Sequence, residues 1–358
     1  MNNQTIKVAI VTGPTGGHFF PGLAIGEQLR EKGKDVFFFI PDRTYITRWL
    51  EQKGFPYKVM PEVKITIKNP LSLFKLIYLT ILSCNTLLIK QFNLVVITGS
   101  YTSLPFLLAS FFCNKKTFVH EQNFLYGRFT KFSSFIANKI GLSFPQRDIS
   151  KRGNTVITGF PIPQDFKKRH SRNDVLEEFG LTEDKTTVLV FGGSQGALFL
   201  NTLITENMDY LSKKNLQFIH IAGKDNEIIS KKYKMYNIKA KVFDFYFDMA
   251  KLYNITDLTI SRAGAGTLAE ICEWLIPAIV IPYPYAGGHQ KHNALYFAQQ
   301  GGCYILEQNQ DSIKSFAGIF ERTLDNSDIL KQQLEKLSIV DTAGNNVSEI
   351  LRLFKNGT

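Results

Sequence analysis

The sequence contains one short pattern twice: an apolar run ends in a glycine-rich loop, and a segment with helical character follows. The first copy is Lys7–Gly13, continued by Gly13–His18; the second is Val188–Gly193, continued by Gly192–Ala197. A buried strand, a glycine loop and a helix in this order are typical of doubly wound α/β domains. Because a chain of 358 residues is about twice as long as a typical domain, two such domains are expected.

Further apolar runs predict the other strands, and continuous apolar strands are typical of parallel sheets covered on both faces. We predict two Rossmann-like doubly wound domains at residues 1–160 and 161–341, with a ligand cleft between them. A C-terminal helix at about 342–358 is expected to pack back on the first domain. The first helix is expected to begin near Pro21, since proline is favoured in a first turn. The predicted strands are Asp35–Pro41, Tyr57–Met60, Leu94–Gly99, Thr117–Gln122, Lys139–Phe144, Gln217–Gly223, Lys241–Phe245, Leu258–Arg262 and Ala278–Tyr283.

Both glycine loops have the composition of an anion site. Glycine lets backbone N–H groups approach an anion closely, and the N-terminus of the following helix favours negative charge. In the second loop, the hydroxyl group of Ser194 suits either a phosphate oxygen or the helix cap. Neither loop has the GxGxxG or the Walker pattern. A tight turn therefore remains the alternative for both, as it does for Gly99–Ser103.

Another polar cluster follows the predicted strand Leu258–Arg262. Small residues lead there to Thr267 and Glu270 at the start of a helix. Such a segment suits a phosphate and a ribose, because a carboxylate accepts hydrogen bonds from ribose hydroxyl groups. The alternative is a capped helix in which Glu270 interacts with the helix dipole. Gln290 is a candidate for hydrogen bonding to a sugar, whereas His120, as a single histidine, is more often structural.

The net charge of +11 lies in the first half, where residues 1–158 hold 20 Lys and Arg against 8 Asp and Glu. Such asymmetry predicts an anionic partner. Apolar segments with lysines, Asn69–Phe92 and Phe111–Lys116, favour an anionic membrane surface, with a helix buried in the core as the alternative. No nucleic acid is expected, since no basic helix or base-stacking motif accompanies the charge. The clean apolar run Leu76–Ile89 has 14 residues, fewer than the roughly 20 that span a bilayer.

No metal and no cofactor are expected. The four cysteines are scattered and the six histidines form no ligand cluster, which fits a reducing compartment and excludes a disulfide framework. The chain has no Asp-x-Asp sequence. A transferase that holds a divalent cation with carboxylates is therefore disfavoured.

The motifs together resemble those of the MurG family, which adds N-acetylglucosamine to undecaprenyl-diphospho-muramoyl-pentapeptide. The resemblance covers nearly the whole chain, and the order and spacing of the motifs are specific. The chain departs from the family at Pro14 and Ser100, where glycine is common, and at Pro163, where many members have arginine. The matching motifs are Thr15–His18 with Pro21-Gly22, Ser100-Tyr101 with Pro105, His120–Asn123, Gly192–Ala197, Arg262–Glu270, and Gln290 with Asn293-Ala294.

The resemblance implies a GT-B fold with the UDP-sugar held mainly by the second domain and the lipid acceptor by the first. On the acceptor side and at the donor sugar it implies Thr15, Gly16, Gly17 and Asn123. On the donor it implies Ser194 at the diphosphate, the backbone near Tyr246 at the uracil, Glu270 at the ribose and Gln290 at the sugar. The phosphate and ribose would be lined by Ala265, Gly266, Thr267, Leu268 and Ala269.

The expected reaction is an inverting, metal-independent transfer from UDP-N-acetylglucosamine to the lipid-linked muramoyl-peptide of peptidoglycan synthesis (lipid I to lipid II). The protein is expected at the cytoplasmic side of the cell membrane, bound peripherally. His18 is the candidate general base, because a near-neutral pKa suits proton transfer; binding of the donor phosphate is its alternative role. Three other functions compete: a UDP-N-acetylglucosamine 2-epimerase, a glycosyltransferase with a different acceptor, and a non-enzymatic nucleic-acid-binding protein.

Overall fold

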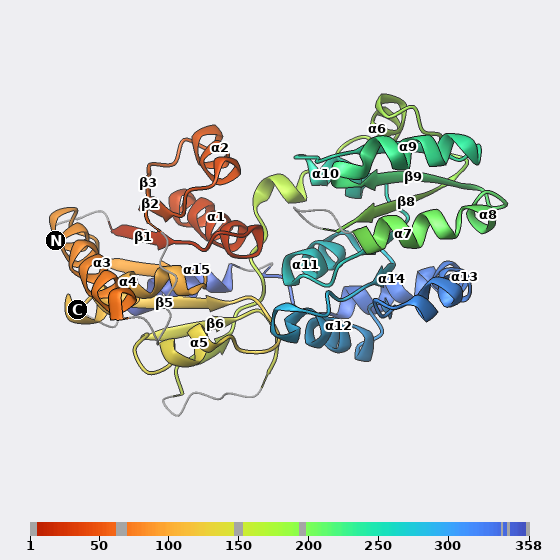
Figure 1. Ribbon diagram of the computed structural model, residues 1–358. Coiled ribbons are helices and arrows are strands. Elements are labelled where there is room, and N and C mark those ends of the chain that lie inside the picture. Colours follow the sequence, from red (N-terminus) through yellow and green to blue (C-terminus); the bar gives the residue numbers. More distant parts are fainter. Residues whose placement is uncertain are drawn as a thin grey trace. The chain divides into compact units, whose positions relative to one another are not determined.

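The chain forms two compact units, each built on its own parallel sheet. The computed structural model describes residues 6–61, 70–146, 153–192, 198–337, 339–341 and 344–355. Unit 1 comprises Met1–Pro163 and Ile339–Thr358, and unit 2 comprises Gln164–Ser338. Figure 1 shows helices packed along the sheet of each unit. The predicted α/β fold class with two doubly wound sheets is confirmed.

The seven strands of unit 1 are all parallel, in the order β3-β2-β1-β4-β5-β6-β7. Their central members are continuous apolar runs and are buried, as expected of a sheet covered on both faces. Strand β7 was not predicted; it has three residues, two of them partly buried and one exposed. The strands are β1 (Lys7–Val11), β2 (Asp35–Ile40), β3 (Tyr57–Val59), β4 (Leu94–Ile97), β5 (Lys116–Glu121), β6 (Lys139–Leu142) and β7 (Thr155–Ile157).

The helices of unit 1 include one whose start was predicted wrongly. Helix α1 begins at Gly16, so Pro21 lies inside the helix. The backbone N–H groups of His18 and Phe19 both donate to the carbonyl of Thr15 and close the first turn before the proline. Because proline has no backbone N–H group, the helix lacks one hydrogen bond, the one from residue 21 to the carbonyl of Gly17. The helices are α1 (Gly16–Glu31), α2 (Thr44–Gln52), α3 (Pro70–Ile89), the 3₁₀ turn Tyr101–Ser103, α4 (Leu104–Phe112), α5 (Arg128–Ser133) and α15 (Asn345–Lys355).

Helix α3 is longer than its clean apolar run suggested. It has 20 residues because Lys75 lies within it rather than ending it. The 19 residues Leu71–Ile89 have a mean hydropathy of 1.7, so the helix is long and apolar enough to cross a membrane by length and composition alone. The length argument against spanning was therefore wrong. One side of α3 nevertheless packs in the unit 1 core, where Leu87 and Leu76 contact the cluster that includes residues of α4.

The described residues of unit 2 form a sheet of six parallel strands in the order β10-β9-β8-β11-β12-β13. Alternate residues of β8 point into two separate apolar clusters, with Val188 and Val190 in one and Leu189 and Phe191 in the other. The two-residue strand β13 was not predicted. The strands are β8 (Thr186–Phe191), β9 (Leu216–Ile221), β10 (Lys239–Phe243), β11 (Leu258–Ser261), β12 (Ala278–Val280) and β13 (Tyr304–Ile305). The helices are α6 (Arg172–Glu178), α7 (Leu198–Glu206), α8 (Met208–Leu211), α9 (Asn226–Met235), α10 (Met249–Asn254), α11 (Ala265–Trp274), α12 (His289–Gln299), α13 (Gln310–Asp325) and α14 (Ser327–Lys336).

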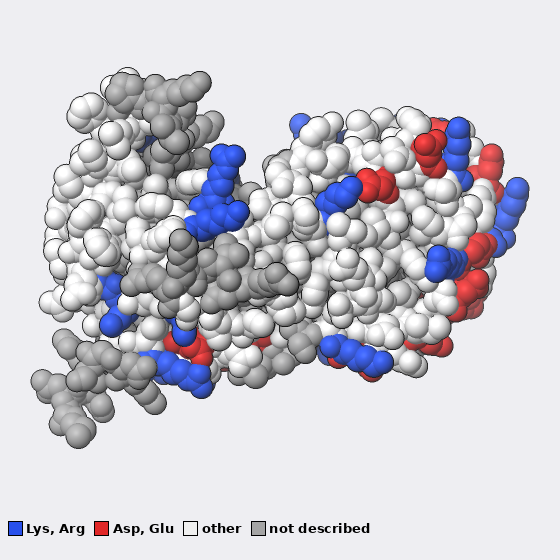
Figure 2. Space-filling model, turned by 90° about the horizontal axis from the view of Figure 1, so that it is seen from below, with Lys and Arg blue, Asp and Glu red and all other residues white. Residues whose placement is uncertain are grey.

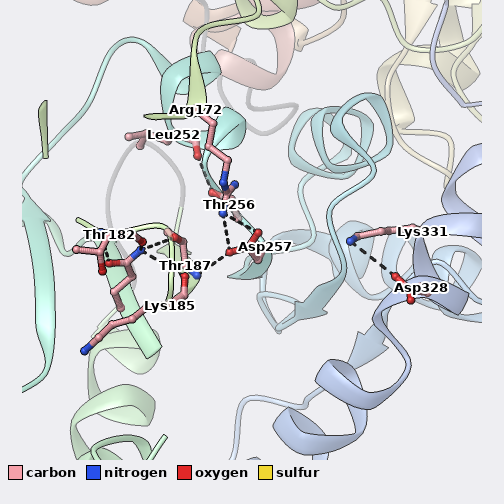
Figure 3. A network of polar contacts seen from close by, with 10 residues as sticks. Arg172, Thr182, Lys185, Thr187, Leu252, Thr256, Asp257, Asp328 and Lys331 are labelled. Atoms are coloured by element: carbon pink, nitrogen blue, oxygen red, sulfur yellow. Dashed lines mark hydrogen bonds and ion pairs between the residues drawn. The ribbon is translucent and has the colours of Figure 1, made fainter. Parts of the chain in front are cut away.

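A polar network fastens α6 to the amino ends of β8 and β11 (Figure 3). Asp257 accepts two hydrogen bonds of 2.9 Å from Arg172 and one of 2.8 Å from the backbone N–H of Thr187. The side-chain amide of Gln217, which is fully buried in β9, donates to the carbonyl of Thr182 and the hydroxyl of Thr187. This network stabilises the end of the sheet opposite to the carboxyl ends of the strands.

The C-terminal helix α15 returns to unit 1 and is held there by buried polar contacts. Phe160 and Val340 form a parallel bridge. The buried amide of Asn346 donates to the carbonyl of Gly159 at 3.1 Å and to Asp341 at 2.8 Å, and it accepts from the hydroxyl of Thr158 at 2.8 Å. Together with the packing of α15 on α1, β5 and β6, these bonds hold the first turn of α15 beside Gly159.

Candidate functional site

The carboxyl ends of β1, β4 and β5 meet at one edge of the unit 1 sheet. The sheet order runs outward in one direction from β1 and in the other from β4. Ligands bind at such switch points in doubly wound sheets. Three loops come together there: Gly13–Thr15, Thr98–Ser100 and Gln122–Asn123.

His18 lies in the first turn of α1, and its imidazole ring fills the space between the first two loops. A Cβ at Gly13 would lie 2.8 Å from Cδ2 of His18, and a Cβ at Gly99 would lie 2.8 Å from its Nδ1. Gly99 also has a φ of 94°, a conformation that favours glycine. Both glycines are therefore required for packing against this ring, a reason that neither an anion loop nor a simple turn had suggested.

The imidazole of His18 is held through its Nδ1 atom. Nδ1 lies 3.0 Å from the carbonyl oxygen of Thr98 and 3.1 Å from Oε1 of Gln122. Both are acceptors in this arrangement, so Nδ1 carries the proton of the neutral ring. The lone pair then lies on Nε2, which is the atom that can accept a proton.

His120 lies behind His18 and Gln122 and is completely buried. Burial lowers the pKa of its imidazole to about 4, so the ring is neutral at neutral pH. Its Nε2 lies 3.2 Å from the carbonyl oxygen of Gly159, and its Nδ1 lies 3.1 Å from the amide nitrogen of Gln122. His120 thus belongs to the support of the site rather than to its surface.

Asn123 is held at the same edge by Glu121. The buried carboxylate of Glu121 accepts from the backbone N–H of Asn123 at 3.0 Å and from that of Gly127 at 3.1 Å, and also from the hydroxyl of Thr130. One carboxylate therefore organises the loop that follows β5.

Thr15, Gly16 and Gly17 form the N-terminus of α1 beside His18. Thr15 and Gly17 are exposed. Thr15 is the N-cap residue, but its side chain makes no capping hydrogen bond. The first N–H groups of α1 are thus suited to an anion or to a polar ligand group.

Ser100 sits in a conformation that costs energy for a residue with a side chain. Its φ is 79° and its ψ is 142°, a combination that is favourable almost only for glycine. We expect Ser100→Gly to raise the free energy of unfolding by about 1 kcal/mol, since relief of strain exceeds the added entropy of glycine. Chemical denaturation checks this. Asn114→Gly, at a φ of 49° that asparagine tolerates, is the control; equal shifts for the two variants would contradict strain at Ser100.

In unit 2 the corresponding switch point lies between β8 and β11. The loop after β8 includes Ser194, which lies outside the described residues. After β11, helix α11 begins at Ala265 with Gly264 as its N-cap and no side-chain capping bond. The buried amide of Asn293 donates to the carbonyl of Ala263 at 3.3 Å. The predicted segment Ala265–Ala269 is therefore the first part of a helix, and its N-terminus, which has no side-chain cap among the described residues, suits an anion.

Glu270 lies one turn into α11 and is held by a buried tyrosine. The hydroxyl group of Tyr253 donates to Oε2 of Glu270 at 2.5 Å. Burial raises the pKa of Glu270 to about 7, and the bond from Tyr253 opposes this rise. The ring centroids of Tyr253 and Trp274 lie 6.1 Å apart. This packing holds the tyrosine that donates to the Glu270 carboxylate.

The remaining candidates of unit 2 have defined surroundings. Oε1 of Gln290 accepts from the backbone N–H of Tyr283 at 2.9 Å. The ring of Tyr246 packs 4.7 Å from that of Phe243 and 5.8 Å from that of Phe179. Because this ring is engaged in the core, only the backbone near Tyr246 suits a ligand.

Three residues that organise these sites had no role predicted from the sequence. Gln122 was quoted in a motif, Thr98 lay within the predicted strand Leu94–Gly99, and Tyr253 was not singled out. Thr98 and His18 are separated by 80 residues, and Gln122 and His18 by 104. The sequence contained no local signal for these contacts, apart from the glycines that make room for the ring.

Comparisons with known proteins cover both units. The glycosyltransferase family 28 N-terminal domain matches residues 8–142, and the family 28 C-terminal domain matches residues 187–343. The UDP-N-acetylglucosamine--N-acetylmuramyl-(pentapeptide) pyrophosphoryl-undecaprenol N-acetylglucosamine transferase of Aquifex aeolicus (strain VF5) is 35% identical over 310 residues, which cover 85% of this chain and 88% of that protein. The chain belongs to the MurG family of glycosyltransferases. The transferase with the same name from Protochlamydia amoebophila (strain UWE25) is 32% identical over 313 residues, covering 84% and 83% of the two chains.

A solved MurG structure agrees with the fold. The crystal structure of Acinetobacter baumannii MurG matches with a TM-score of 0.76 at 24% identity, and the match covers 98% of this chain and 100% of that chain. The GT-B architecture expected from the MurG resemblance is thereby confirmed. The roles of individual residues stay predictions.

Proposed function

We propose that the protein transfers N-acetylglucosamine from UDP-N-acetylglucosamine to undecaprenyl-diphospho-muramoyl-peptide, with inversion and without a metal ion. The observation that carries the proposal is that curated relatives at 32–35% identity, matched over most of both chains, are named for this transfer. The two switch-point sites supply the groups that such a reaction needs.

The donor is assigned to unit 2. The open N-terminus of α11, with Ala265 to Ala269, suits the diphosphate, since its N–H groups and dipole favour negative charge. Glu270 is assigned to the ribose hydroxyl groups, Gln290 to the sugar, and the backbone near Tyr246 to the uracil. Ser194 is assigned to the diphosphate from the family resemblance alone.

The acceptor is assigned to unit 1, with Thr15, Gly16, Gly17 and Asn123 beside it. The acceptor hydroxyl oxygen forms a bond to the anomeric carbon, and the bond from that carbon to the UDP oxygen breaks. Nε2 of His18 takes the hydroxyl proton, because the proton of the neutral ring is on Nδ1. The negative charge that develops on UDP is stabilised by the backbone N–H groups of α11.

The lipid-linked acceptor requires a membrane contact, and we assign it to α3 and α4, bound peripherally at the cytoplasmic side of the cell membrane. The two helices pack together, and large apolar side chains are exposed on both. Lys75 and Lys90 are exposed on the same segment. On the face shown in Figure 2, Asp and Glu gather mainly over unit 2. The exposed apolar residues are Leu71, Leu73, Phe74, Ile77, Tyr78, Ile81, Leu88, Ile89, Phe111 and Phe112.

The double variant Ile77→Glu with Phe112→Glu tests this surface. Each apolar side chain contributes about 1.5–3 kcal/mol when it is fully buried, so we expect binding to vesicles containing phosphatidylglycerol to fall at least about tenfold. Sedimentation with vesicles measures it. Ile228→Glu with Met235→Glu, at exposed positions of α9, is the matched control. Equal binding by both double variants would refute the assignment.

The transfer itself is tested with radiolabelled UDP-N-acetylglucosamine and a lipid-linked muramoyl-peptide in detergent, with EDTA present. Labelled lipid product is expected. An epimerase would instead act on the donor without acceptor. Label transferred only to another lipid would favour a different glycosyltransferase, and activity lost in EDTA would refute metal independence.

A further inference from the structure

The side-chain amide of Gln122 has only one orientation that satisfies its neighbours. Its Nε2 lies 2.9 Å from the carbonyl oxygen of Thr98 and 3.0 Å from that of His120. Because carbonyl oxygens can only accept, the NH₂ group must face them. Oε1 therefore faces His18, and a flipped amide would place this one oxygen atom against both carbonyl oxygens.

His120 reinforces this orientation. Its Nδ1 lies 3.1 Å from Nε2 of Gln122, and its Nε2 lies 3.2 Å from the carbonyl oxygen of Gly159. Since the latter contact requires a proton on Nε2, Nδ1 is left as a third acceptor for the Gln122 amide. The carbonyl of Gly159 also accepts from Asn346 of α15. The chain of contacts therefore ends on the helix that returns to unit 1.

We propose that Gln122 is a positioning residue that holds the ring of His18 with its proton on Nδ1, and that His120 orients Gln122 for this task. This rests on the proposed function, in which Nε2 of His18 accepts the proton. A ring with the other tautomer would place a lone pair against the oxygens of Thr98 and Gln122 and would present an N–H group to the acceptor hydroxyl. Turnover then falls although the donor site in unit 2 is unchanged.

The first test reads the tautomer directly. Long-range ¹H–¹⁵N spectra of the full chain labelled in its six histidines distinguish a protonated Nδ1 from a protonated Nε2. The His18 signals are assigned by their loss in His18→Gln. We expect the Nδ1-protonated form in the wild type and a larger share of the other form in Gln122→Met. A wild-type ring protonated on Nε2 would overturn the proposal.

The second test separates positioning from folding. Gln122→Met is expected to lower kcat at least about tenfold while KM for UDP-N-acetylglucosamine changes less than about threefold, because general base catalysis contributes roughly 10²–10⁴-fold. Gln217→Met removes an equally buried, equally bonded glutamine and should leave kcat unchanged at a comparable loss of thermal stability.

The outcomes separate this proposal from the proposed function. Unchanged kcat in Gln122→Met, or an equal loss in Gln217→Met, would overturn the positioning role. If Gln122→Met does not fold, the tautomer of the wild-type ring decides, and a His18 ring protonated on Nε2 would overturn the role. If the wild type transfers no sugar while the Nδ1-protonated tautomer depends on Gln122, the proposed acceptor reaction fails and the positioning of His18 stands.

Discussion

Turnover of the His18→Ala variant is expected to fall by about 10²–10⁴-fold, with affinity for UDP changed less than about threefold. The expected size of the fall in turnover follows from the usual contribution of a general base. The direction follows from the site: Nδ1 of His18 is held by Thr98 and Gln122 within unit 1, whereas the residues proposed to bind the donor belong to unit 2. Single-turnover transfer measured at saturating donor, with calorimetry for UDP, separates the two effects.

The main risk of this variant is a structural one, because the ring fills the space beside Gly13 and Gly99. His18→Gln keeps much of the volume and offers an amide N–H to the carbonyl of Thr98, so it is the variant of choice if His18→Ala unfolds. His220→Gln, at a fully buried histidine of β9 bonded to Tyr233 and Asn201, controls for the loss of a buried ring. Turnover unchanged in both His18 variants would eliminate the general-base role, and a large loss of UDP affinity would favour phosphate binding instead.

The fold could be predicted from the sequence to the extent that local patterns determine it. Continuous apolar runs predicted the central parallel strands, and the two glycine loops marked the strands at the switch points. The local sequence patterns failed where the structure depends on neighbouring elements. The edge strands β7 and β13 are too short to produce a signal. Pro21 is tolerated within α1 because the turn before it is already closed on Thr15.

The site was harder to predict from the sequence than the fold, because its key contacts join residues far apart in sequence. The pattern placed His18 and Asn123 at strand ends, and parallel topology brings such ends to one edge. It did not reveal which of the four residues His120–Asn123 point toward His18. Alternation along a strand separates Glu121, which organises the loop after β5, from His120 and Gln122, which support the ring.

The second large effect is expected at Glu270, where binding of UDP-N-acetylglucosamine should depend on pH. Burial raises the pKa of this carboxyl to about 7, and in the proposed donor site the ionised form is the one that would accept two ribose hydroxyl groups. Affinity should therefore fall up to about tenfold between pH 8 and pH 6. The sugar nucleotide is the right probe, since free UDP has a terminal phosphate that itself titrates near pH 6. Calorimetry at several pH values measures the dependence.

The pH dependence of the free energy of unfolding has the opposite sign. A raised pKa means that the folded protein keeps a proton that the unfolded chain loses between the ordinary value of 4.5 and about 7. The contribution of Glu270 to the free energy of unfolding therefore falls as pH rises through this window. A rise in pH through this window thus strengthens donor binding and lowers the contribution of Glu270 to folding stability. The ligand should therefore stabilise the protein more at pH 8 than at pH 6.

Two variants decide whether Glu270 is responsible. Glu270→Gln should weaken donor binding by about 10–100-fold at pH 8, the loss of charge-assisted hydrogen bonds, and remove the pH dependence in this range. Tyr253→Phe should shift the midpoint to higher pH, because the hydroxyl that lowers the pKa of Glu270 is gone. Tyr233→Phe, at a buried tyrosine bonded to His220, should shift nothing. If Tyr253→Phe leaves the midpoint in place, the titrating group is not Glu270, and the carboxylate holds α11 rather than the ribose.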